Sequence, residues 1–166
     1  MKKILMVILA GLTAAGFAEL DKKAVFGRKV YDRENESTKS EELNAKIYGI
    51  YFSAHWCPPC RQFSPVLVDA YNEIQEDGGR FEILFVSSDQ TESAMFDYMN
   101  ALEMPWLAVE FGSDEADGLK EDYDVRGIPK LIIIDADGNL ITEDGRADVQ
   151  RFGAEAYDQW VKKAVN

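Results

Sequence analysis

The feature that most constrains this chain is a Cys-x-x-Cys pair between a strand-like and a helix-like segment. Cys57 and Cys60 are the only cysteines among 166 residues, and two prolines separate them. Before them, Ile47–Ser53 is a nearly continuous apolar and aromatic run, typical of a strand buried on both faces. A helix N-terminus favours a thiolate, and a second thiol one turn later can attack a mixed disulfide. The pattern therefore predicts a redox-active dithiol.

After the cysteines, apolar residues recur with the period of a helix. The stripe occupies positions i, i+3, i+4, i+7, i+8 and i+11, at Phe63, Val66, Leu67, Ala70, Tyr71 and Ile74. Pro65 lies inside it and predicts a kink, because its ring removes a backbone donor. A second apolar run, Phe81–Ser87, follows at the spacing of a strand–helix–strand unit. The two strands are therefore predicted to be parallel.

The remaining segments predict an α/β domain. We expect an edge strand over 24–31, a polar loop over 32–42, helices over 91–102, 114–123 and 148–165, a strand over 131–134, and a turn over 135–139 that returns at 140–142. Either Thr91 or Asp89 is a plausible N-cap for the second helix. Parallel strands in the first half and a hairpin in the second predict a mixed central sheet with helices on both faces.

The N-terminus resembles an export signal. Lys2 and Lys3 form a basic start, Ile4 to Leu12 is apolar, and Gly16-Phe17-Ala18 fits a small-residue cleavage site. The apolar segment is shorter than the about 20 residues that span a bilayer, although an uncleaved anchor is the alternative. We predict a signal peptide over 1–18, an N-terminal extension over 19–45 and one domain over 46–166. The predicted location is the periplasm or another extracytoplasmic space.

The charge of the chain excludes two classes of partner. Without residues 1–18, 16 basic residues face 30 acidic ones, a formal charge of −14. Nucleic acids and anionic membrane surfaces both require a basic face. The chain is therefore not expected to bind either.

Two other interpretations of the cysteine pair are weaker. A structural disulfide closing so short a loop would constrain the unfolded chain little. A closed zinc site needs four ligands, and the only histidine, His55, is too close to Cys57 for a tetrahedral arrangement. No nicotinamide or flavin fingerprint is present. We therefore expect no metal and no cofactor, and a redox partner must supply or accept the electrons.

Four separated motifs in this sequence resemble those of a known protein family. They are Tyr51-Phe52-Ser53-Ala54-His55-Trp56-Cys57-Pro58-Pro59-Cys60-Arg61, Phe85-Val86-Ser87-Ser88-Asp89, Met104-Pro105-Trp106-Leu107-Ala108-Val109 and Gly127-Ile128-Pro129-Lys130-Leu131-Ile132. Their order resembles the nucleoredoxin and tryparedoxin branch of the thioredoxin-like superfamily, over roughly residues 47–146. The resemblance implies a thioredoxin-like fold.

The resemblance also implies roles for individual residues. Cys57 matches the nucleophilic cysteine and Cys60 the resolving one. Pro129 matches a cis-proline beside the dithiol, and Ile128 would offer backbone hydrogen bonds to an extended substrate. Trp56 is expected to shield the dithiol and contact the substrate rather than fill the core.

Two positions leave questions open. Thioredoxins carry a buried acid six residues before the nucleophile, whereas this chain has Tyr51, so the general base for Cys60 is unassigned. Asp89 is one candidate, with a helix cap as its alternative role. A charged His55 would lower the pKa of Cys57, unless its ring points away.

These observations predict a protein-disulfide reductase that acts on disulfides in exported proteins or on small thiols. A dithiol oxidase or isomerase of folding proteins is one alternative. A module that binds clients with an idle dithiol is another, and a peroxidase is a weaker one. The sequence decides neither the direction of electron flow nor the substrate, the oligomeric state or the role of residues 32–42.

Overall fold

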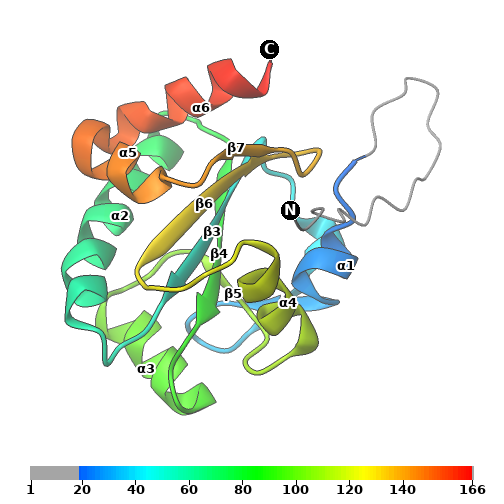
Figure 1. Cartoon of the computed structure of the whole chain (residues 1–166), viewed down its shortest axis with the longest axis vertical. Coiled ribbons are helices and arrows are strands. Elements are labelled where there is room, and N and C mark those ends of the chain that lie inside the picture. Colours follow the sequence, from blue (N-terminus) through cyan, green and yellow to red (C-terminus); the bar gives the residue numbers. More distant parts are fainter. Residues whose placement is uncertain (1–18, 166) are drawn as a thin grey trace.

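The structure is a computed structural model that describes residues 19–165, so the predicted signal peptide lies outside the described residues. Its seven strands form one sheet in the order β2-β1-β5-β4-β3-β6-β7 (Figure 1). The strands are β1 Lys29–Tyr31, β2 Ser37–Lys39, β3 Ile47–Ser53, β4 Phe81–Ser87, β5 Leu107–Val109, β6 Lys130–Asp135 and β7 Leu140–Thr142.

Helices cover both faces of this sheet. They are α1 Lys22–Phe26, α2 Pro58–Glu76, α3 Glu92–Ala101, α4 Asp114–Asp122, α5 Gly145–Phe152 and α6 Ala156–Ala164, with short 3-10 turns at Ser40–Glu42 and Gly153–Glu155. Between residues 19 and 165, none of the helices is long and apolar enough to cross a membrane.

The strand pairing confirms the predicted mixed sheet. The central strand β3 is parallel to β4 and antiparallel to β6. β4 is in turn parallel to β5, while β6 and β7 form an antiparallel hairpin. Parallel β3 and β4 end at the same edge of the sheet, and α2 begins just beyond β3, so the cysteines lie at that edge.

Side chains of β3 alternate between two cores. Tyr51 faces a core formed with α2, α3, α5 and α6, where it packs edge-on against Phe63 and Trp106. Tyr48 faces the opposite core under α1 and α4 and contacts Phe26. The predicted helix stripe is buried except for Val66, which is 42% exposed. The helix continues through Pro65.

The prediction for residues 24–42 was partly wrong. Residues 22–26 form helix α1, capped by the Asp21 carboxylate, which accepts from the Ala24 N–H at 3.0 Å. Only Lys29–Tyr31 is a strand, and it pairs with β5 on one side and β2 on the other, so it is not an edge strand. The predicted polar loop contains β2 and a 3-10 turn. The segment predicted as an extension thus adds two strands to the sheet.

The predicted C-terminal helix is two helices. α5 ends at Phe152 and is followed by Gly153, which has a φ of 56° that L-residues rarely adopt, and α6 starts at Ala156. Trp160 on α6 is fully buried, and its indole N–H donates to the Asp148 carboxylate at 2.9 Å. This hydrogen bond ties the two helices together across the break.

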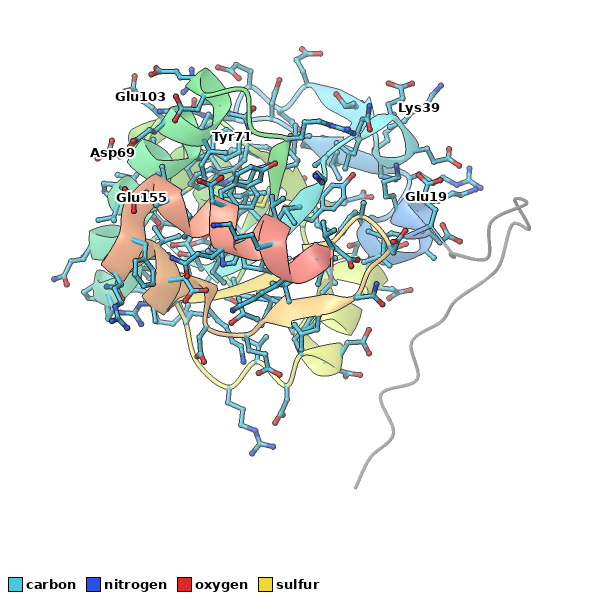
Figure 2. The ribbon with its side chains drawn as sticks, turned by 90° about the horizontal axis from the view of Figure 1, so that it is seen from above. Glu19, Lys39, Asp69, Tyr71, Glu103 and Glu155 are labelled. Atoms are coloured by element: carbon cyan, nitrogen blue, oxygen red, sulfur yellow. A yellow bond between two sulfur atoms is a disulfide. The ribbon has the colours of Figure 1, made fainter. Side chains whose placement is uncertain are left out.

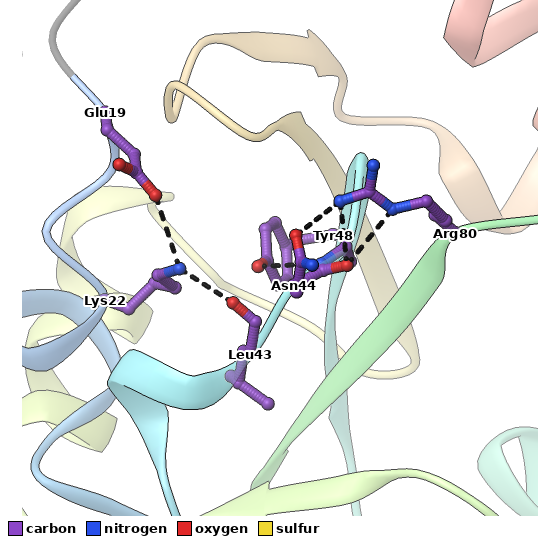
Figure 3. Close-up of polar contacts among 7 residues, drawn as sticks. Glu19, Lys22, Leu43, Asn44, Tyr48 and Arg80 are labelled. Carbon is purple, nitrogen blue, oxygen red and sulfur yellow. Dashed lines mark hydrogen bonds and ion pairs between the residues drawn. The ribbon is translucent and has the colours of Figure 1, made fainter.

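At the edge of the sheet opposite the cysteines, polar contacts hold the chain that enters β3 (Figure 3). The Lys22 ammonium donates to the Leu43 carbonyl at 2.7 Å and pairs with Glu19 at 3.5 Å. The Arg80 guanidinium donates to the Asn44 carbonyl at 3.1 Å. These contacts line an open hollow of about 550 Å³.

Near this edge, β4 carries a carboxyl group in an apolar setting. Tyr71 lies among packed side chains in Figure 2, whereas Asp69, on the same helix, lies at the surface. The Tyr71 hydroxyl donates to the Glu82 carboxylate at 3.3 Å, and the Ile83 N–H donates to it at 2.9 Å. Burial raises the pKa of Glu82 to about 7, and these two hydrogen bonds oppose the rise.

Candidate active site

The two cysteines form a disulfide at the start of α2. Cys57 is the N-cap residue in an extended conformation, Pro58 and Pro59 occupy the first helical positions, and Cys60 completes the turn. The cysteine Cα atoms are 5.2 Å apart, within the usual range for a disulfide. Proline is favoured at the first helical position, where a backbone N–H has no helical partner. The first N–H of the helix therefore belongs to Cys60 itself.

The two cysteines differ in accessibility. Cys57 is 4% exposed and Cys60 is fully buried. Both pack with Ala54, and Ile128 lies against them. Of the two cysteines, only Cys57 therefore keeps any contact with solvent.

The loop before β6 borders the disulfide. The peptide bond between Ile128 and Pro129 is cis, as predicted. The Cys57 sulfur lies 3.8 Å from the Ile128 carbonyl oxygen. The predicted nucleophile and the predicted substrate-binding peptide are thus brought together, from positions 71 residues apart.

Pro129 also lines a hollow of about 560 Å³. Its lining includes Lys130, Arg146 and Gln150. The guanidinium of Arg146 lies over the Phe63 ring at 5.8 Å, and its Nε is buried without a hydrogen-bond partner. Arg146 was not predicted as a site residue, because no motif marks it and only the fold brings α5 beside Pro129.

Trp56 lies outside the core, as predicted. Its side chain is 59% exposed, unlike Trp106 and Trp160, which are buried. The indole N–H donates to the Ser88 carbonyl at 2.9 Å. This hydrogen bond fixes an exposed aromatic ring at the residue that precedes Cys57.

Asp89 does not cap α3, so the alternative role considered for it was wrong. The cap is Thr91, whose hydroxyl accepts from the Ala94 N–H at 3.1 Å. The Asp89 carboxylate instead accepts from the backbone N–H of His55 at 2.8 Å. It therefore holds the active-site loop, defined here as residues 54–57.

The His55 ring is directed toward α3. It stacks on the Tyr98 ring with centroids 5.1 Å apart and planes inclined by 12°. The hydrogen bonds of the described residues include none from this ring to either cysteine. That His55 lowers the pKa of Cys57 stays a prediction. Such an effect would be an electrostatic one, without a hydrogen bond between the ring and the cysteine.

A chain of buried hydroxyl groups lies beneath the active site and was missed by the sequence analysis. Tyr51 and Ser64 are 2.7 Å apart, Ser64 and Tyr98 2.7 Å, and Tyr98 and Ser53 3.1 Å. Burial and the neighbouring Tyr98 raise the pKa of Tyr51 above its ordinary value. The position that carries an acid in thioredoxins therefore belongs to a neutral hydroxyl network. The general base for Cys60 is still unassigned.

Residues 19–165 contain no cluster of three or more His, Cys, Asp or Glu side chains able to hold a metal ion. The polar groups near the dithiol are instead hydroxyls, backbone amides and the Asp89 carboxylate. This arrangement is suited to thiol–disulfide exchange at Cys57. The cis peptide bond of Ile128 and Pro129 and the exposed ring of Trp56 border that cysteine.

Comparison with known proteins gives consistent similarities. A family model described as thioredoxin-like matches residues 44–140. Nucleoredoxin from Danio rerio is 47% identical over 116 residues, which cover 69% of this chain and 27% of that protein. The chain thus spans about a quarter of the length of the nucleoredoxins it matches.

Solved structures extend the similarity to the whole fold. A thioredoxin from Wuchereria bancrofti shares 40% identity at a TM-score of 0.72, covering 87% of this chain and 99% of its own. A tryparedoxin II complexed with glutathionylspermidine shares 33% identity at a TM-score of 0.70, covering 80% of this chain and 92% of its own. The fold predicted from the sequence motifs is therefore confirmed.

Proposed function

The chain belongs to the thioredoxin-like family of thiol–disulfide oxidoreductases, and we propose that it reduces disulfides in exported proteins or small thiols through Cys57 and Cys60. The observation that carries the proposal is the disulfide between a slightly exposed Cys57 and a fully buried Cys60, beside the cis peptide bond of Pro129. Trp56 and Ile128 provide the adjoining surface for a substrate.

The proposed reaction consists of two exchanges. The Cys57 thiolate attacks one sulfur of the substrate disulfide, so that bond breaks, a mixed disulfide forms and one substrate thiolate leaves. Cys60, once deprotonated, then attacks the Cys57 sulfur, and the second substrate thiolate leaves. The substrate gains two electrons and takes up two protons, while the enzyme is left with the Cys57–Cys60 disulfide. An external dithiol partner restores the reduced form.

The surface around Pro129 supports an extended peptide or a small peptide thiol as substrate. In this proposal an extended substrate chain pairs with the backbone of Ile128, a common mode of peptide recognition. The tryparedoxin II complex contains a small thiol compound, glutathionylspermidine, and we extend that class to this chain. No cofactor is required, because both electrons stay on sulfur throughout.

The direction of electron flow is tested by the equilibrium between the dithiol and the disulfide. We expect a reduction potential between about −270 and −230 mV, the range of thioredoxin and glutaredoxin-like reductants. We also expect the reduced protein to reduce insulin disulfides with dithiothreitol as electron source. Titration in glutathione buffers, followed by tryptophan fluorescence, measures the potential. A value near about −120 mV would instead support the alternative function, a dithiol oxidase of folding proteins.

We further propose that residues 1–18 are an export signal cleaved before Glu19, so that the enzyme acts outside the cytoplasm. The basic start and short apolar segment support this. Expression of the full chain in a bacterial host should yield periplasmic protein whose N-terminal sequence begins Glu-Leu-Asp. Recovery of the unprocessed chain in the cytoplasm would contradict the proposal.

A further inference from the structure

The residues that follow β4 contact the active-site loop at two points and the end of β3 at a third. The Ser88 N–H donates to the Ser53 carbonyl at 2.9 Å, and the Ser88 carbonyl accepts from the Trp56 indole at 2.9 Å. The Asp89 carboxylate accepts from the His55 N–H at 2.8 Å. These hydrogen bonds leave the loop little freedom just before the nucleophilic cysteine.

Asp89 differs from the other residues that make these hydrogen bonds, because its side chain is a carboxylate. It is only 9% exposed, and none of the ion pairs among residues 19–165 involves it. Its second carboxylate oxygen accepts from the Ser87 hydroxyl at 2.8 Å, and its own N–H donates back to that hydroxyl at 2.9 Å. The carboxylate is thus stabilised by neutral donors alone, and its charge acts on its surroundings without a cation to offset it.

The nearest group whose charge changes in the reaction is the thiol of Cys57. The Asp89 carboxylate accepts from the N–H of His55, two residues before Cys57, so the chain between them keeps this carboxylate within roughly 15 Å of the Cys57 sulfur. A negative charge at this range opposes the formation of a thiolate. Opposing the thiolate disfavours the reduced form relative to the disulfide, since only the reduced form carries that charge.

We propose that Asp89 is a positioning residue that sets the redox balance of the dithiol. Its carboxylate fixes the active-site loop through the His55 N–H, and its charge biases the Cys57–Cys60 pair toward donating electrons. This inference rests on the proposed function, because it assigns the direction of exchange at the same dithiol.

Asp89→Asn separates the charge from the hydrogen bond. The amide oxygen of asparagine can still accept from the His55 N–H, while the negative charge is removed. We expect the equilibrium with glutathione to shift three- to tenfold toward the dithiol, equivalent to about 14 to 30 mV. We also expect the rate of Cys57 alkylation by iodoacetamide at pH 7 to rise by a similar factor, because more thiolate is present.

Asp135→Asn is the matched control. Asp135 is 8% exposed and accepts from the backbone N–H groups of Asp137 at 2.9 Å and Asn139 at 2.8 Å. It pairs with Ile47 at the start of β3, so it lies at the edge of the sheet away from the dithiol. It should change neither the equilibrium nor the alkylation rate. Ser87→Ala, which keeps the charge, should not shift the equilibrium toward the dithiol.

The inference is overturned if Asp89→Asn leaves both readouts at wild-type values, or if Asp135→Asn moves them equally. Should Asp89→Asn fail to fold, Asp89→Ser keeps a short uncharged oxygen acceptor and is expected to shift both readouts in the same direction. Both readouts need only a folded dithiol. A wild-type protein without insulin reductase activity would therefore refute the proposed function while leaving the role of Asp89 measurable.

Discussion

Replacing Cys57 with serine is expected to lower disulfide reductase turnover by at least about 10³-fold. A serine hydroxyl stays protonated near neutral pH and cannot form the mixed disulfide through which both electrons pass. Cys60 cannot substitute for it, because its side chain is fully buried. The measurement is insulin reduction with dithiothreitol as electron source, corrected for the uncatalysed rate.

Cys60→Ser provides the matched comparison. The first exchange at Cys57 can still occur, but no second thiol completes the reaction, so mixed disulfides should accumulate. Non-reducing electrophoresis would show them as adducts that dithiothreitol removes, and Cys57→Ser should form none. Adducts on the Cys57→Ser variant, or full turnover by it, would exclude Cys57 as the nucleophile.

Glu82→Gln is expected to change the pH dependence of folding stability. The pKa of Glu82 is raised from 4.5 to about 7 in the folded protein, chiefly by burial. A raised folded-state pKa means that the folded protein binds the proton more tightly, so stability is lost as pH rises from 4.5 through 7. Glutamine keeps an oxygen acceptor for Tyr71 and Ile83 without the charge. The variant should therefore be more stable than the wild type by about 3 kcal/mol at pH 8.

The difference should fall to about 0.2 kcal/mol at pH 4, where the wild-type carboxyl is protonated in the folded state and mostly protonated in the unfolded state. Urea unfolding of both proteins between pH 4 and 8 measures it. Glu73→Gln makes the same change on the exposed face of α2 and should shift stability by less than about 0.5 kcal/mol throughout. Equal stability of wild type and Glu82→Gln at pH 8 would show that the Glu82 carboxylate is not penalised by burial.

The central strands and the active-site helix could be predicted because buried segments have a clear pattern of apolar residues in the sequence. β3, β4 and β6 are nearly continuous apolar runs, and all seven residues of β3 are buried. The dithiol and Pro129 were located because their motifs are local. The short elements before β3 could not be predicted in this way, since three residues carry too little periodicity. β1 is a strand because β5 and β2 pair with it.

The parts of the site that were missed depend on long-range contacts. Tyr98 joins Ser64 and Ser53 across 34 and 45 residues, and no spacing in the sequence relates them. Asp89 was noticed as an acid near a strand end, but its partner, the His55 N–H, is a backbone group that carries no sequence signal. The role of Asp89 could not be predicted, because any residue except proline at position 55 would supply the same backbone N–H.

The position of Glu19 determines how the enzyme would be oriented if it were held by a tether. The Leu20 N–H donates to the Ala136 carbonyl, in the turn after β6, at 3.2 Å. That turn borders the start of β3, and the seven residues of β3 extend about 23 Å from there toward the cysteines. In Figure 1 the segment that leads into α1 and the start of α2 lie on opposite sides of the molecule. A surface that carries the protein through Glu19 would therefore leave the dithiol facing outward, open to substrates as bulky as folded proteins.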